Sequence, residues 1–280
     1  MHEDAKTMRG MRVSVLPDNE SMGIAAGRDA ACLFREGAAD DAGEVAAIFA
    51  AAPSQDTFLA RLCEEPGIDW KRVRAFHLDE YLDLERGHPN TFEKYLNEHL
   101  FDRVPIPRGN ILFFKDFQGD AARVAAQYAT GLREGVSRVK ANGGRYVACI
   151  GIGVNGHMAF NDPGTAVWTP EWTCAVTIDE TSARQQYDDY RDHPDPEARY
   201  AALADVPRRA LTVTCAGILA ADVILCMVPG KQKSAAVQRV LEGPITADVP
   251  ASLLRLHGDV RLYLDADAAC ALRQQPIADS

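Results

Sequence analysis

Short apolar segments alternate with helical patterns along almost the whole of this 280-residue chain. The apolar segments have the length and residue types of strands, and we expect strands at 12–16, 45–50, 73–77, 111–114, 146–150, 174–178, 210–213, 223–228 and 260–264. Helices are expected in the intervals at 19–34, 54–63, 90–100, 120–140 and 231–241. This alternation predicts an α/β fold, with a doubly wound, mostly parallel sheet and helices on both faces in a Rossmann-like arrangement.

The sequence predicts one domain over residues 12–265, a flexible segment at 1–11 and a C-terminal tail at 266–280. There is no internal repeat and no Ser/Gly-rich linker to suggest a second domain. Residues 185–205 are rich in Asp, Arg, Tyr and Pro, and they form either a mobile cover over a site or a solvated surface insertion.

Composition excludes several classes of function. A formal net charge of −10 argues against nucleic-acid binding, because the phosphate backbone would be repelled. No apolar run is long enough to span a membrane, and the first residues lack the pattern of a secretory signal. The seven cysteines are odd in number and form no C-x-x-C pair, so we expect free thiols, a cytoplasmic location and no metal site.

The segment 151–164, GIGVNGHMAFNDPG, directly follows the predicted strand at 146–150. In an open α/β sheet, ligands bind beyond the carboxyl ends of the strands, where glycines let the backbone approach a substrate. His157 could move a proton near neutral pH, with Asp162 fixing its tautomer and Asn155 holding the ring or a substrate hydroxyl. The alternative is a histidine that hydrogen-bonds only within its own loop.

A second candidate site segment, the acidic pair Asp79-Glu80, comes just after the predicted strand at 73–77. Adjacent residues in extended chain point to opposite faces, so only one of these two carboxylates is expected in a site. Asp79 could serve as a general base, particularly if burial raises its pKa. The alternative, which local sequence alone favours because acids often cap turns, is that Asp79 caps the turn that follows.

Two segments are suited to binding phosphate. Ser54 lies near a predicted helix N-terminus, where backbone N–H groups favour anions, although an ordinary Ser N-cap would explain it too. Lys231 and Lys233 open another predicted helix, where cations are unfavourable unless an anion offsets them. This placement favours an anion site, with solvated surface lysines as the alternative.

Taken together, these segments resemble the glucosamine-6-phosphate deaminase/isomerase family, which shares a fold with the 6-phosphogluconolactonases. The resemblance covers about residues 12–265 and lies mainly in Leu78-Asp79-Glu80-Tyr81, His88-Pro89-Asn90-Thr91-Phe92, Gly151-Ile152-Gly153, Asn155-Gly156-His157-Met158-Ala159-Phe160-Asn161-Asp162-Pro163, Val206-Pro207, Ala210-Leu211-Thr212-Val213 and Gly230-Lys231-Gln232-Lys233. The tripeptides Asn-Gly-His and Asn-Asp-Pro resemble those of a variant branch of this family.

The resemblance implies opening of a sugar ring and isomerisation with loss of ammonia, most simply from glucosamine 6-phosphate to fructose 6-phosphate. It assigns removal of the C2 proton to Asp79, ring opening to His157 with support from Asp162, and phosphate binding to Lys233. Backbone N–H groups of the glycine loop, at Gly153 and Gly156, could stabilise the enolamine intermediate. No metal or organic cofactor is required, and the expected partner is a small phosphorylated amino sugar.

Several positions depart from the usual family pattern. Asn155 replaces an aspartate, Asp162 replaces a glutamate, and the phosphate turn Ala51-Ala52-Pro53-Ser54 has no glycine. Arg184 is the candidate for the arginine that helps hold phosphate. We expect Asn155 to lower the basicity of His157 relative to an aspartate neighbour, because a nearby anion stabilises imidazolium.

Two other functions fit the same sequence. A sugar-lactone phosphate hydrolase would use His157 to activate water and would have little need for Asp79. A non-catalytic sugar-phosphate sensor would need none of the proton-transfer groups. The sequence leaves open a homo-oligomeric assembly.

Overall fold

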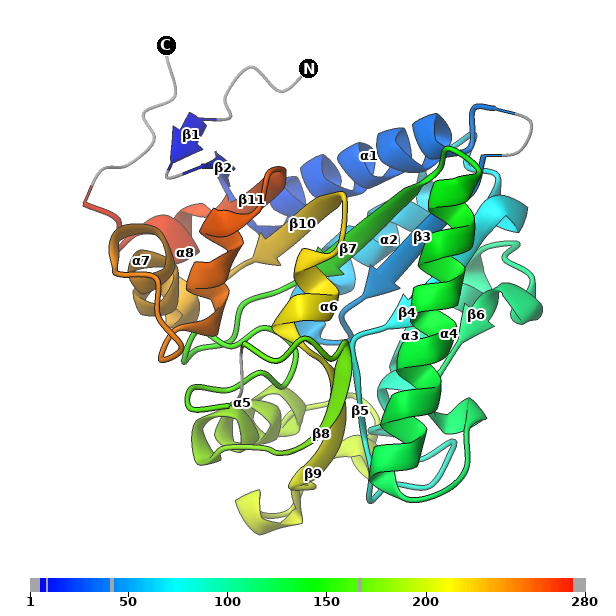
Figure 1. Cartoon of the computed structure of the whole chain (residues 1–280). Helices are drawn as coiled ribbons and strands as arrows, with labels where there is room; N and C mark the ends of the chain where they lie inside the picture. Colours follow the sequence, from blue (N-terminus) through cyan, green and yellow to red (C-terminus); the bar gives the residue numbers. More distant parts are fainter. Residues whose placement is uncertain (1–5, 9, 41–42, 166–167, 274–280) are drawn as a thin grey trace.

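The computed structural model describes residues 6–8, 10–40, 43–165 and 168–273 (Figure 1). Its centre is an eight-stranded sheet in which every neighbouring pair is parallel except the first. This confirms the predicted fold class. In spatial order the strands are β1 Lys6–Met8, β2 Met11–Leu16, β11 Val260–Asp265, β10 Val223–Val228, β7 Arg145–Ile150, β3 Val45–Phe49, β4 Val73–His77 and β6 Ile111–Leu112.

Two apolar cores lie on the two faces of this sheet. Because side chains alternate along a strand, Ala46 and Ile48 of β3 enter one core while Val45, Ala47 and Phe49 enter the other. The first core is covered by α4 (Ala121–Ala141), α7 (Ser234–Glu242) and α8 (Ala266–Ala269). The second is covered by α1 (Asn19–Gly37), α2 (Asp56–Glu64) and α3 (Phe92–His99).

The direction of the strand order reverses between β3 and β7. From β3 the chain proceeds to β4 and β6 on one side, and from β7 it proceeds to β10 and β11 on the other. The loops that leave β3 and β7 therefore separate at the carboxyl edge of the sheet. Such a switch point is where open α/β sheets bind ligands.

A second sheet lies below the main one in Figure 1. Its strands are antiparallel and follow the order β5 (Asp79–Tyr81), β9 (Arg209–Val213) and β8 (Thr173–Thr177). The strands predicted at 174–178 and 210–213 thus exist but lie outside the parallel sheet. Along β8 the partly buried Cys174 and Val176 alternate with the exposed Ala175 and Thr177, as expected for a strand with one solvated face.

Other boundaries differ from the sequence prediction. Residues 185–205 are not wholly irregular, because α5 spans Glu180–Tyr190. The domain continues past residue 265, since Ala268, Ala269 and Leu272 are buried in the core. In the segment expected to be flexible, β1 pairs with β2, while residues 1–5 and 9 lie outside the described part. Residues 274–280 of the predicted tail also lie outside it.

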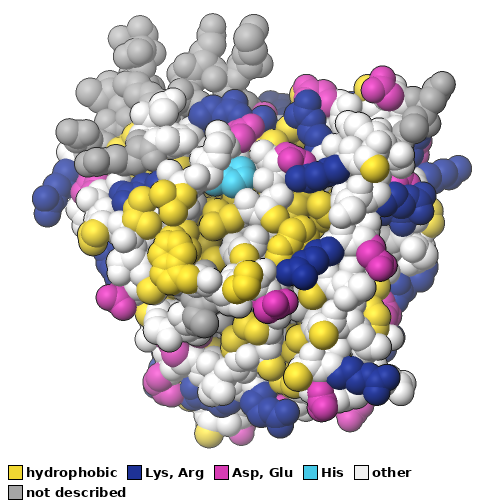
Figure 2. Space-filling view, in the orientation of Figure 1, with side chains coloured by type: hydrophobic (Ala, Val, Ile, Leu, Met, Phe, Trp, Pro, Cys, Tyr) yellow, Lys and Arg dark blue, Asp and Glu magenta, His cyan; other side chains and the backbone are white. Residues whose placement is uncertain are grey.

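Charged side chains of both signs lie across the visible surface (Figure 2). On the face shown in Figure 2, basic and acidic side chains are interspersed rather than gathered by sign. Among the described residues, no helix is both long and apolar enough to cross a membrane.

Candidate active site

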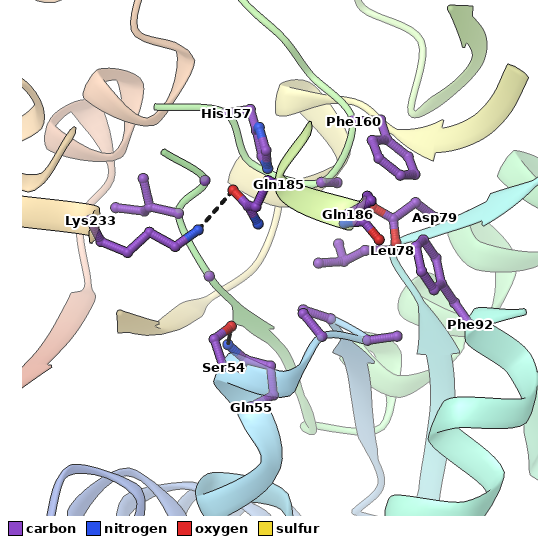
Figure 3. Close-up of a pocket in the computed structure, with 17 residues that line it drawn as sticks. Ser54, Gln55, Leu78, Asp79, Phe92, His157, Phe160, Gln185, Gln186 and Lys233 are labelled. Carbon is purple, nitrogen blue, oxygen red and sulfur yellow. Dashed lines mark hydrogen bonds between the residues drawn. The ribbon is translucent and has the colours of Figure 1, made fainter. Parts of the chain in front are cut away.

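A pocket opens at the switch point, between the loops that follow β3, β4 and β7 and the start of α7 (Figure 3). It encloses about 60 Å³ of free space and adjoins a second hollow of about 310 Å³ that extends toward Gly230 and Asp265. Ser54, Gln185 and Lys233 line both spaces. The two spaces thus meet at the end of the pocket that carries the lysine.

Asp79, the first residue of β5, lines the pocket and is only 7% exposed. Burial, reinforced by the charge of Glu80, raises the pKa of Asp79 well above its usual range. Glu80 points elsewhere, and its carboxylate accepts hydrogen bonds from the backbone N–H groups of Phe92 and Glu93 at the start of α3. Glu80 therefore serves the first backbone N–H groups of α3, whereas Asp79 lines the pocket.

Aromatic rings keep the surroundings of Asp79 dry. Phe92 and Phe160 line the pocket, their ring centroids are 5.8 Å apart, and Tyr81 packs against both. A carboxylate against such a wall loses hydration, which favours its protonated form and strengthens its basicity once ionised. This is the environment that a base for a carbon acid requires.

His157 also lines the pocket, and its ring lies flat against the backbone of Gly153. A Cβ atom at position 153 would come within 2.0 Å of the imidazole Cε1, so only glycine fits there. Gly156 has a φ of 92° and packs against Val249, and it does not line the pocket. The N–H groups of Gly153 and Gly156 donate to His157 O and Gly153 O. The loop itself uses both N–H groups as donors, whereas Gly153 still lines the pocket.

Asn155 and Asp162 lie behind His157 and form a hydrogen-bonded cluster around its ring, which we call the polar support. Asp162 Oδ1 lies 3.3 Å from His157 Nδ1. The side-chain amide of Asn155 donates to Asp162 at 3.3 Å and to Asp179 at 3.0 Å, while its oxygen accepts from the N–H of His157. Burial alone would raise the pKa of Asp162, but its hydrogen bonds, with His157 first and then with the N–H of Asp179 and the hydroxyl of Ser182, lower it to about 2. Asp162 is thus an anion at neutral pH.

The opposite end of the pocket carries Lys233 and Ser54. Lys233 is 6% exposed, and burial lowers its pKa to about 8 against the opposing charge of Asp189. Both carboxylate oxygens of Asp265 accept from the N–H of Gly230, which fixes the turn before Lys233. The backbone N–H of Gly230 is therefore already hydrogen-bonded to the carboxylate of Asp265.

Ser54 does not cap α2 or the short helix before it. Its Oγ instead accepts a hydrogen bond from Gln55 Nε2 at 3.2 Å, and Gln55 Nε2 also lies 3.4 Å from the carbonyl oxygen of Met227. The Ser54 side chain lines both hollows and keeps its hydroxyl donor for a ligand there. Ser54 and Lys233 together present donors suited to an anion.

Helix α5 supplies residues that the sequence analysis missed. Gln185 and Gln186 line the pocket, and Ser182 contacts both His157 and Asp162. Arg184 is exposed, its Cζ lies 6.0 Å from the ring centre of Tyr187, and it does not line the pocket, so the structure does not bring it together with Ser54 and Lys233. Successive helical residues are rotated by about 100°, which turns Arg184 outward while Gln185 and Gln186 face inward.

Comparison with known proteins gives the family. A family model described as glucosamine-6-phosphate isomerases/6-phosphogluconolactonase matches residues 36–187, more than half of the chain. The chain belongs to this family. A glucosamine-6-phosphate deaminase of Arthrobacter is 32% identical over 77% of this chain and 75% of its own length. One from Bacillus pumilus is 28% identical over 92% of this chain and 98% of its own length.

Solved structures agree with this assignment. A monomeric glucosamine-6-phosphate deaminase superposes with a TM-score of 0.79 at 26% identity, over 93% of this chain and 100% of its own. The 6-phosphogluconolactonase of Trypanosoma brucei, at 17% identity and a TM-score of 0.69, covers 95% of this chain and 100% of its own. The lactonase shares the fold, and the resemblance inferred from sequence motifs is confirmed.

Proposed function

We propose that this member of the family is a glucosamine-6-phosphate deaminase, converting glucosamine 6-phosphate and water into fructose 6-phosphate and ammonium. The observation that carries the proposal is the buried carboxylate of Asp79 in the same pocket as His157 and Lys233. Hydrolysis of a lactone needs no base for a C–H bond, whereas isomerisation of an aldose does. The deaminases among the relatives support the same choice.

The chemistry follows from this arrangement. His157 assists transfer of the O1 proton to the ring oxygen, which breaks the C1–O5 bond and gives the open aldehyde. Asp79 then removes the C2 proton while O1 takes up a proton from the substrate ammonium group, which gives an enolamine. Asp79 returns its proton to C1, which gives a protonated imine at C2. Water adds to that imine and ammonium leaves, so the C2 ketone of fructose 6-phosphate remains. Each proton transfer is general acid–base catalysis, with no change of oxidation state overall.

The phosphate group is assigned to the end of the pocket that holds Lys233 and Ser54. Among the described residues, no three His, Cys, Asp or Glu side chains gather as a metal site requires. All seven cysteines are unpaired, which supports the cytoplasm as the location of the enzyme.

The proposal is tested by comparing ammonium release from glucosamine 6-phosphate with hydrolysis of 6-phosphogluconolactone by the same preparation. We expect turnover of the amino sugar alone. Rapid lactone hydrolysis without ammonium release would instead assign the chain to the lactonase branch. Tight binding of a hexose phosphate with no product would indicate a sensor.

A further inference from the structure

Ser182 of α5 lies at the centre of the polar support behind His157 and is only 1% exposed. Its Oγ is 2.7 Å from Nδ1 of His157 and makes a very short hydrogen bond with Oδ1 of Asp162. Its backbone N–H donates to Oδ1 of Asp179, the N-cap of α5, at 2.6 Å. The helix cap therefore fixes where this hydroxyl lies.

The hydrogens in this cluster can be assigned by counting donors. Asp162 is ionised and can only accept, and a serine hydroxyl has one hydrogen to give. That hydrogen goes to Asp162, so Ser182 Oγ can offer His157 only a lone pair. The hydrogen between Ser182 and His157 must then belong to Nδ1 of the imidazole. A neutral imidazole carries one N–H, which leaves Nε2 as an unprotonated acceptor.

His157 can interact with Asp162 either directly or through the hydroxyl of Ser182, and the direct contact is the weaker of the two. Nδ1 and Asp162 Oδ1 are 3.3 Å apart, whereas charge-assisted hydrogen bonds are about 2.7–2.9 Å long. The hydroxyl of Ser182 reaches each group at a shorter distance. Asn155 Nδ2 also lies 3.4 Å from Ser182 Oγ and can donate only, which agrees with the same assignment of hydrogens.

We propose that Ser182 is a positioning residue that holds His157 in the Nδ1–H tautomer, so that Nε2 is the atom that moves the proton during ring opening. This role rests on the proposed function. Nε2 accepts the proton of the O1 hydroxyl and delivers it to O5 as the C1–O5 bond breaks and the C1=O bond forms. While Nε2 holds the proton, Asp162 balances the imidazolium charge through the Ser182 hydroxyl.

The decisive measurement is nitrogen-15 NMR of the imidazole groups in the whole enzyme, with the His157 signals assigned by their loss in His157→Gln. In the unmodified enzyme near pH 7.5 we expect His157 to be the Nδ1–H tautomer. In Ser182→Ala we expect a mixture of both tautomers. This readout needs no substrate, so it decides the role of Ser182 even if the deaminase assignment fails.

Kinetics on glucosamine 6-phosphate provide the second readout. Ser182→Ala should lower kcat by about 10–10²-fold, with KM changed less than about twofold, because the hydroxyl acts on a proton transfer and touches no substrate atom. Adding Asp162→Glu to Ser182→Ala should restore the Nδ1–H tautomer and part of kcat, since the longer carboxylate can reach Nδ1 directly. Thr181→Ala, an exposed neighbour on the same helix, is the matched control and should leave both readouts unchanged.

Two results would overturn the proposal. One is an Nε2–H tautomer of His157 in the unmodified enzyme, which requires no variant to fold. The other is a single Nδ1–H tautomer with undiminished kcat in Ser182→Ala, which would show that the hydroxyl has no part in orienting the ring.

Discussion

The Nζ atom of Lys233 donates a hydrogen bond to Oε1 of Gln185 at 2.8 Å, as drawn in Figure 3, and the backbone N–H of Val154 donates to the same oxygen at 3.0 Å. An ammonium group and an amide N–H thus converge on a neutral oxygen atom. This is the environment of an anion, and it lies where we assign the phosphate. We infer that a substrate phosphate displaces Gln185 from Lys233.

Gln185→Ala and Gln185→Glu should therefore change KM for glucosamine 6-phosphate in opposite directions. Alanine removes the competing oxygen and should lower KM a few-fold. Glutamate places a charge on Lys233 that phosphate must displace, and should raise KM by about tenfold or more. Steady-state kinetics measure both, with the exposed Arg184→Ala as the control. Equal increases in KM for both variants would instead mean that Gln185 binds the substrate.

Phosphate binding should weaken in alkaline solution because of Lys233. Burial lowers its pKa to about 8, so the ammonium is present below that pH and is lost as the pH rises through it. We expect kcat/KM for the phosphorylated substrate to fall above about pH 8. Lys233→Met should lower kcat/KM by about 10–10²-fold at pH 7 and remove this alkaline limb. The idea fails if the limb persists unchanged in Lys233→Met.

Asn155→Asp adds a third carboxylate beside Asp162 and Asp179, which the Asn155 amide now contacts. The added anion should stabilise the imidazolium form of His157, so the acidic limb of the pH–rate profile should move to higher pH. Repulsion among the three carboxylates should also lower the thermal midpoint. A pH–rate profile measures the first effect, and an acidic limb left in place would count against it.

Asp79→Asn should raise stability while it abolishes turnover. The pKa of Asp79 is raised in the folded state, so its ionised form costs folding free energy at every pH above the unfolded value. A neutral amide of the same shape removes that cost, and Tm at pH 7.5 should rise. Ammonium release should fall by about 10²–10⁴-fold. Calorimetry measures the change in Tm, and a coupled assay measures ammonium release. Full turnover in this variant would exclude Asp79 as the base.

The sequence alone was enough to find the site residues that follow parallel strands. Asp79, His157 and Lys233 follow β4, β7 and β10, and strands that run the same way bring their following loops to one edge. The parallel order of the sheet was predictable for the same reason, because each buried strand is a short apolar run.

The contribution of α5 could not be predicted in this way. Its buried residues include Ser182, Gln186 and Tyr190, so it has no apolar stripe at helical spacing. Its inward side is polar because it faces the pocket and the support of His157 rather than an apolar core. The family resemblance suggested Arg184, but one helical step separates it from the side chains that line the pocket.

The general base and the phosphate end belong to different sheets. Asp79 is carried by β5 of the small antiparallel sheet, whereas Ser54 and Lys233 follow strands of the main sheet. The separation between them is consequently set by how the two sheets pack, and each carbon between C2 and the phosphate must fit that span. Under the proposed function we therefore expect selectivity for sugar length, with a 2-amino pentose 5-phosphate, one carbon shorter, unable to reach both ends at once.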